Sequence, residues 1–256
     1  MRTIDLNADM GESFGQWRMG DDRALLDVVT SANVACGFHA GDPLVLAETL
    51  QLAAERDVVV GAHVSYRDLA GFGRSFIDVD PGQLRAELVY QLAAITGVAR
   101  TVGARVAYVK PHGALYNTIV HHQGQATAVV EAVQVINQTL ESPLAILGLP
   151  GALVLELAEQ AGIATAREAF ADRGYTPEGR LVSRREPGAV LHDADEVARR
   201  MVELVTTGSL TAVDGSRVQI QADSICVHGD SPGAVAMARA VRVALDQAGI
   251  TLKSFR

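Results

Sequence analysis

The sequence predicts an α/β protein folded as a closed but irregular parallel (β/α) barrel, and three observations lead to this fold. Short apolar runs alternate with helical patterns along all 256 residues, which is typical of strand–helix units around a parallel sheet. The central runs are apolar on both faces, as strands are when helices cover the outside of a barrel. No linker or change of composition divides the chain, so we expect a single domain over residues 1–256. An open, doubly wound sheet is the alternative that this pattern allows.

Seven strands are predicted from short apolar runs that end in Gly, Pro or polar residues. They span residues 3–7, 31–36, 58–63, 106–110, 144–149, 164–170 and 224–228. The first alternates polar and apolar side chains and stops before an acidic stretch, residues 9–12. The fourth ends at Lys110, because Pro111 removes a backbone donor and favours an extended residue before it. Residues 217–220 could add a further strand.

Helical patterns follow these strands in turn. They cover residues 21–29, 43–56, 81–102, the stretch from the Lys110 region to about 140, 150–162, 194–205 and a closing segment to about 247. Asp42 is the predicted N-cap of the second helix, and Pro43 and Pro81 suit first helical positions. The glycine-rich loop 65–78 is expected to act as a mobile lid, and residues 174–193 are expected to form a long loop with a hairpin.

Composition excludes several classes of protein. The formal net charge of −8 and the absence of a basic cluster argue against nucleic acid or an acidic membrane as partner. The N-terminus reaches polar residues too soon for a signal-peptide core, and no apolar run is long enough to span a bilayer. We therefore expect a cytoplasmic protein. Cys36 and Cys226 are expected to be reduced, buried thiols, and no feature of the sequence marks Cys36 as a nucleophile.

Lys110 stands out because the chain has only one other lysine, Lys253, and uses arginine for the rest of its positive charge. A desolvated ammonium group can lose its proton, whereas a guanidinium group cannot. The sequence therefore predicts either a chemical role for Lys110 or a structural one, in which it pairs with a neighbouring carboxylate.

Polar residues gather where the predicted strands end. They are Asn7, Asp9, Glu12, His39, Asp42, His63, Lys110, His112, Asp172, Arg173, His228 and Asp230. The carboxyl ends of parallel barrel strands open onto one face, so we expect one shared pocket.

Two chemistries suit such a pocket, and the spacing of the residues does not choose between them. One is a catalytic divalent metal with an open position for water. The other is metal-free amide or ester hydrolysis, in which a carboxylate or histidine activates water and Lys110 or Arg173 stabilises the oxyanion. The sequence has no nucleotide-binding Gly-rich loop that ends in Lys-Ser/Thr. Arg74, in the predicted lid, is available to meet an anionic ligand or a carboxylate.

Five motifs resemble the LamB/YcsF family of 5-oxoprolinase A subunits. They are residues 5–12 (DLNADMGE), 32–43 (ANVACGFHAGDP), 110–117 (KPHGALYN), 170–173 (FADR) and 226–230 (CVHGD). The resemblance implies an irregular seven-stranded parallel (β/α) barrel of the glycoside hydrolase/deacetylase type. It also implies the ATP-dependent opening of the lactam 5-oxo-L-proline to L-glutamate, in a complex with subunits B and C. Because the chain lacks a nucleotide loop, we expect the partners to handle ATP while this chain handles the activated lactam.

We assign roles to the pocket residues as expectations. The expected catalytic residues are Asp9, Glu12, Lys110 and His112. The expected substrate-binding residues are Asn7, His39, Asp42, His63, Arg74, Asp172, Arg173 and His228. The candidate ligands of a divalent metal are His39, His63 and His228. A metal-dependent amidase or deacetylase, and a non-catalytic lactam-binding subunit, are the alternative functions.

Overall fold

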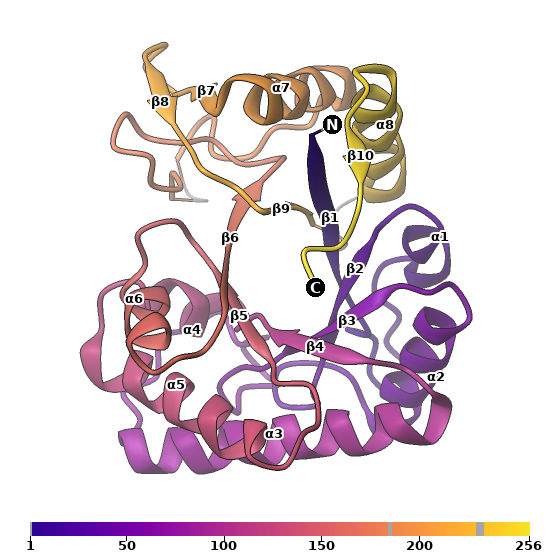
Figure 1. Ribbon diagram of the computed structural model, residues 1–256, viewed down its shortest axis with the longest axis vertical. Coiled ribbons are helices and arrows are strands. Elements are labelled where there is room, and N and C mark those ends of the chain that lie inside the picture. The colour runs from indigo at the N-terminus through magenta and orange to yellow at the C-terminus, as the bar shows by residue number, and fades with distance from the viewer. Residues whose placement is uncertain (1, 184–185, 229–232) are drawn as a thin grey trace.

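A closed ring of seven parallel strands forms the centre of the molecule (Figure 1). The computed structural model describes residues 2–183, 186–228 and 233–256. The strands of the ring are β1 (Thr3–Met10), β2 (Ser31–Ala35), β3 (Val59–His63), β4 (Val106–Val109), β5 (Ala145–Gly148), β6 (Thr165–Phe170) and β9 (Ser224–Val227). They pair in this order, and β9 pairs with β1 again. The predicted parallel barrel is therefore confirmed, and closure of the ring excludes the open sheet.

Helices cover the outside of the ring (Figure 1). They are α1 (Asp22–Leu26), α2 (Pro43–Ala54), α3 (Pro81–Val102), α4 (Gly113–Thr118), α5 (Gln123–Asn137), α6 (Leu153–Gln160), α7 (Ala194–Thr207) and α8 (Ala234–Gln247). Helix α3 packs beside α5, and α7 packs beside α8. Asp42 is the N-cap of α2, as predicted, since its Oδ1 accepts hydrogen bonds from the backbone N–H groups of Leu44 and Val45, both at 2.9 Å. Among the described residues, no helix has both the length and the apolar character needed to cross a membrane.

The helix predicted from the Lys110 region to residue 140 is in fact two helices, α4 and α5. The break lies at residues 119–122, where His122 takes an extended conformation and caps α5. Its Nδ1 accepts a hydrogen bond from the backbone N–H of Gln125 at 3.2 Å. Histidine is an uncommon N-cap, so the apolar pattern on either side concealed the boundary.

Strand β1 extends to Met10, beyond the predicted end at Asn7, so Asp9 lies within the strand instead of after it. The side chains of Asn7 and Asp9 are both hydrogen-bonded to Asn33 on the neighbouring strand, which donates to Asn7 Oδ1 at 2.6 Å and to Asp9 Oδ1 at 2.8 Å. Buried polar groups are tolerated when they satisfy one another. Polar character therefore did not mark the end of this strand.

The sequence did not predict two elements near the C-terminus. Strand β7 (Ser209–Thr211) pairs with β8 (Arg217–Gln219), the further strand that was expected, and β10 (Thr251–Leu252) adds to the edge of β1. Beyond β10, the chain ends over the ring of strands (Figure 1), where Phe255 packs on Tyr108 with ring centroids 5.0 Å apart. The C-terminal segment therefore covers the end of the barrel opposite the carboxyl ends of its strands.

The predicted long loop over residues 174–193 takes part in two isolated antiparallel bridges, one between residues 175 and 181 and one between residue 190 and residue 173 just before the loop. These bridges are the counterpart of the expected hairpin. Asp230 lies outside the described residues.

Gly61 in β3 leaves space for the ring of Tyr108 inside the barrel. A Cβ atom at this position would lie 2.2 Å from Cε2 of Tyr108. We expect Gly61→Ala to lower the free energy of unfolding by about 1–3 kcal/mol, the usual cost of overpacking a core. Urea unfolding measures this, and Gly97→Ala is the matched control. Gly97 is an exposed helical glycine with open space around it, so its replacement should stabilise the chain by about 0.5–1 kcal/mol. Equal effects of the two substitutions would contradict the packing account.

Candidate active site at the carboxyl ends of the strands

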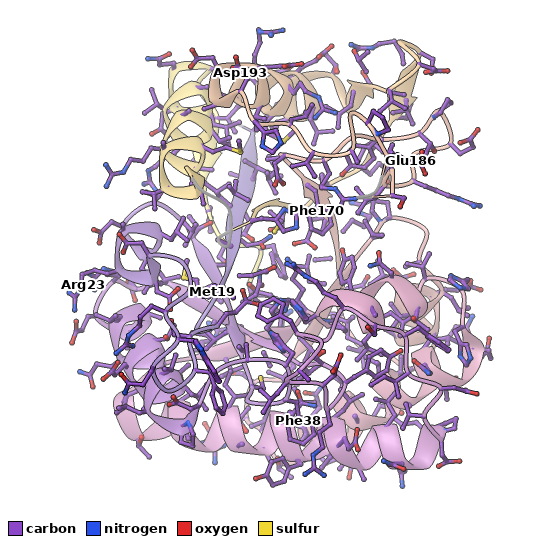
Figure 2. The ribbon with its side chains drawn as sticks, turned by 180° about the vertical axis from the view of Figure 1, so that it is seen from behind. Met19, Arg23, Phe38, Phe170, Glu186 and Asp193 are labelled. Atoms are coloured by element: carbon purple, nitrogen blue, oxygen red, sulfur yellow. The ribbon has the colours of Figure 1, made fainter. Side chains whose placement is uncertain are left out.

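A cavity of about 400 Å³ opens at the carboxyl ends of the barrel strands. Figure 2 shows the side of the molecule opposite to Figure 1, and Phe170, which lines the cavity, lies near the centre of that view. The expected site residues that line the cavity are Asp9, Glu12, His63, Arg74, Lys110, His112, Arg173 and His228. Asn7, His39 and Asp172 are buried behind this lining. Asp42 does not line it, because its carboxylate caps α2 and accepts from Gly15 N–H.

Lys110 is buried between two carboxylates. Its Nζ lies 3.0 Å from Asp9 Oδ1 and 2.9 Å from Glu168 Oε1. Burial alone would lower the pKa of this ammonium group, but the neighbouring carboxylates of Asp9 and Glu168 outweigh burial and hold the pKa well above its ordinary value. The idea that Lys110 loses its proton through desolvation is therefore wrong for this arrangement. The structural alternative, pairing with a carboxylate, is what the structure contains.

Glu168 is a buried site residue that the sequence did not reveal. It lies on β6, is fully buried, and accepts hydrogen bonds from Asn7 Nδ2 at 3.0 Å and from the Tyr116 hydroxyl at 2.8 Å. The only signal in the sequence was a single acid, next to Arg167, within a short β-type run. Glu168 fixes the position of Lys110 from within the barrel.

Asp9 carries a negative charge at neutral pH. Burial would raise the pKa of its carboxyl group, but the nearby positive charges of His63 and Lys110 outweigh burial and lower the pKa well below its ordinary value. Oδ1 of Asp9 binds Lys110 and Asn33, while Oδ2 lies 3.4 Å from Nε2 of His63. One oxygen of this carboxylate is thus held by the barrel, and the other faces the histidines.

Glu12, His39, His63 and His112 form a cluster whose potential ligand atoms all lie within 4.8 Å of one another. His63 Nε2 is 3.0 Å from His112 Nδ1, and His39 Nε2 is 3.2 Å from Glu12 Oε1. Burial, followed by the charge of neighbouring histidines, lowers the pKa of His39 well below its ordinary value and that of His112 to about 3. Neutral imidazoles and a carboxylate are suitable ligands for a divalent cation.

His228 lies apart from this cluster, although it was one of the three candidate metal ligands. Its Nδ1 lies 2.8 Å from both carboxylate oxygens of Asp172, and its ring stacks on Phe170 at 5.3 Å. A carboxylate in this position fixes the orientation and the tautomer of a histidine. The arrangement suits proton transfer at the wall of the cavity.

The loop 65–78, predicted as a mobile lid, is docked against the start of α4. The Gly73 carbonyl accepts a hydrogen bond from Ala114 N–H at 2.8 Å, and the Phe72 carbonyl accepts one from His112 Nε2 at 2.9 Å. Phe72 has a φ of 53°, a left-handed conformation that is unusual for a bulky residue. A Cβ on Gly113 would lie 2.4 Å from the Gly73 carbonyl oxygen, so glycine allows this approach.

Two arginines, Arg74 and Arg173, line the cavity. Arg173 is buried, and its guanidinium donates to the backbone carbonyls of Val182 and Ala189. Arg74 is exposed, with its guanidinium 4.9 Å from the centre of the Phe72 ring. Guanidinium groups in these positions suit an anionic ligand in the cavity.

The chain is similar to a known protein family and to several solved structures. The profile of the LamB/YcsF family matches residues 4–256. The A subunit of a 5-oxoprolinase from Cutibacterium acnes is 66% identical over 254 residues, which are 99% of both chains. The crystal structure of a lactam utilization protein from Thermus thermophilus is 40% identical and superposes with a TM-score of 0.93, covering 99% of this chain and 100% of that one. A polysaccharide deacetylase from Bacillus cereus, 13% identical, shares the fold with a TM-score of 0.50 over 100% of this chain and 93% of that one.

Proposed function

The chain belongs to the LamB/YcsF family, and from this premise we propose that it is the lactam-opening subunit of an ATP-dependent 5-oxoprolinase. The enzyme would convert 5-oxo-L-proline to L-glutamate as ATP is hydrolysed to ADP and phosphate, in the cytoplasm, where ATP is available. The observation that carries the proposal is the full-length similarity to a relative named as the A subunit of a 5-oxoprolinase. The cavity supports it, because it combines carboxylates, a histidine–aspartate pair and guanidinium groups.

The chemistry explains why ATP is needed. A five-membered lactam is a poor electrophile, and transfer of a phosphoryl group to its carbonyl oxygen makes the carbonyl carbon reactive. Water then adds to this carbon, the carbon–nitrogen bond breaks, and the ring nitrogen leaves with a proton. A second water cleaves the resulting acyl phosphate to glutamate and phosphate. This cavity must therefore remove a proton from water, stabilise negative charge and donate a proton to nitrogen.

The residues of the cavity divide these tasks. Asp9, Glu12 or His112 accepts the proton of the attacking water, and Lys110 keeps Asp9 ionised and in place. His228, oriented by Asp172, donates a proton to the leaving ring nitrogen.

The anionic groups of the substrate need separate partners. Arg173 and Arg74, which line the cavity, bind the carboxylate of the lactam or its phosphoryl oxygens. Lys110, which the sequence offered as a group to stabilise an oxyanion, is less suited to binding an anion, since two carboxylates already surround its ammonium group.

In this proposal ATP is bound by the partner subunits B and C. The sequence contains no Gly-rich loop that ends in Lys-Ser/Thr, so this chain lacks the usual backbone cradle for phosphates. Isothermal titration of the isolated chain with ATP should give no saturable binding. Tight binding would contradict this division of labour.

A second candidate function is metal-dependent amide hydrolysis, which the Glu12, His39, His63 and His112 cluster favours. A divalent cation held there would polarise a carbonyl oxygen and make bound water more acidic. Such an enzyme would open amides without ATP or partner subunits, so release of product by the isolated chain in the absence of ATP would favour it.

Reconstitution tests the proposed function. Labelled 5-oxoproline and ATP are incubated with this chain alone, with the two partners alone, and with all three, and glutamate and ADP are measured together. We expect glutamate only in the complete mixture, in step with ADP. The control is a chain with the exposed His121 replaced by alanine, which should behave like the wild type. Absence of glutamate from every mixture of folded subunits would reject the proposal.

A further inference from the structure

We propose that Glu12, His63 and His112 bind one divalent transition-metal ion, best matched by Zn²⁺, and that His39 supports this site without binding the ion. The ligand atoms alone define this site, whether or not the substrate is 5-oxoproline. Three of the four clustered residues are ligands, and the geometry of the fourth excludes it.

Backbone carbonyls hold the outer ring nitrogens of His63 and His112. His63 Nδ1–H donates to the Lys110 carbonyl at 2.8 Å, and His112 Nε2–H donates to the Phe72 carbonyl at 2.9 Å. These bonds fix the orientation of the two rings, with the inner nitrogens, His63 Nε2 and His112 Nδ1, 3.0 Å apart. Both inner nitrogens are therefore placed to bind a single cation beside them.

The spacing of the donor atoms fits a single ion. Two nitrogens that each lie about 2.0–2.1 Å from zinc are roughly 3.0–3.4 Å apart for ordinary bond angles. The inner nitrogens of His63 and His112 are 3.0 Å apart, and Glu12 Oε1 lies 3.6 Å from His112 Nδ1. Two histidines and one glutamate are an established ligand set for catalytic zinc with an open position.

His39 cannot share the ion with His112 in this arrangement. The two rings are stacked, with centroids 3.8 Å apart and planes inclined by only 7°. A metal lies in the plane of the imidazole that binds it, so an ion in the plane of His112 is too far from the plane of His39. The ring of His63 is nearly perpendicular to that of His112, at 87°, and has no such conflict.

The hydrogen bonds of the ring nitrogens that face away from the cluster also distinguish His39 from His63 and His112. Histidines that bind metals almost always donate their other ring N–H to a carbonyl, a carboxylate or water. His63 and His112 meet this condition, whereas the buried Nδ1 of His39 has no hydrogen-bond partner in the described part of the chain. His39 instead contacts Glu12 through Nε2 at 3.2 Å, which is how a supporting residue holds a carboxylate ligand.

The proposed ligands face the cavity, and His39 does not. Glu12, His63 and His112 all line the 400 Å³ space. An open coordination position would therefore point to the substrate. Asp9 Oδ2, 3.4 Å from His63 Nε2, lies beside this position, and with Glu12 and His112 as ligands it is the group left to act as a base.

Zinc titration of the chelator-stripped full chain tests the ligand set, with metal content measured after gel filtration. We expect one Zn²⁺ per chain in the wild type and none in His63→Phe or His112→Phe. In His39→Phe an aromatic ring still stacks on His112, so this variant should retain one Zn²⁺. Its affinity should be lower by about 10–100-fold, the usual cost of losing a supporting group. His121→Phe, at an exposed histidine, is the matched control and should change nothing.

X-ray absorption of the zinc-loaded wild type provides a readout that needs no variant to fold. The spectrum should fit two imidazoles and one carboxylate. Three imidazoles, loss of zinc from His39→Phe with retention in His112→Phe, or no zinc bound to the wild type would each overturn the inference. These measurements use no lactam, ATP or partner, so their failure would leave the proposed ring-opening function to its own test.

Discussion

Replacing Lys110 by methionine is expected to lower the free energy of unfolding by about 3–5 kcal/mol and to abolish glutamate formation by the assembled enzyme. The ammonium group lies within 3.0 Å of carboxylate oxygens of both Asp9 and Glu168. Methionine has a similar length but no charge, so it would leave two buried carboxylates without their counter-ion. Breaking a buried ion pair from one side is costly for this reason. Urea unfolding and the coupled glutamate assay measure the two effects.

Two further variants separate this explanation from a general sensitivity to substitution. Lys253→Met removes the only other lysine, which is exposed, and should change neither stability nor turnover. Adding Glu168→Gln to Lys110→Met should restore part of the lost stability, because it removes one of the unpaired charges. A Lys110→Met chain as stable as the wild type would show that the ion pair does not hold the barrel interior together.

Replacing His228 by glutamine is expected to lower kcat of the assembled enzyme by about 10²–10⁴-fold, the usual contribution of a general acid or base. Glutamine keeps a polar group at the cavity wall, but it cannot carry a proton to the ring nitrogen. Steady-state glutamate formation measures the effect. Asp172→Asn should have a smaller effect on kcat, since it disturbs the orientation of His228 but leaves the imidazole in place.

The control for this prediction is His121→Gln, at an exposed histidine that does not line the cavity. It should retain wild-type kcat. An unchanged kcat in His228→Gln, with the partners still bound, would remove His228 from the proton-transfer step.

The sequence was sufficient to predict the barrel because the signals that mark its strands and helices are local. Each strand is a short apolar run with a turn signal after it, and each helix pattern begins near a proline or a capping residue such as Asp42. Such patterns also place polar residues at strand ends. Because the carboxyl ends of parallel barrel strands open onto one face, Asp9, His63 and His112 gather around one cavity. The family resemblance rests on the same stretches and is confirmed by the profile match over residues 4–256.

Pairings across the barrel could not be predicted, because they depend on register and ring orientation. Glu168 faces inward opposite Lys110 only because β6 has this register against its neighbours. The placement of His228 against Asp172, away from His39 and His63, depends on the path of the chain after β9 and β6. The left-handed Phe72, whose carbonyl orients His112, has no signature in the sequence beyond the adjacent glycine.

The ratio of glutamate to ADP in the enzyme assembled with His228→Gln tests most directly whether the lactam ring opens in this cavity. If the partners activate the lactam and this chain opens it, the variant should continue to form ADP while glutamate falls far behind, because the activated lactam loses its phosphoryl group to water and reverts to 5-oxoproline. We therefore expect a ratio well below that of the wild type. Glutamate formed in step with ADP at the wild-type rate would contradict the account and place ring opening elsewhere.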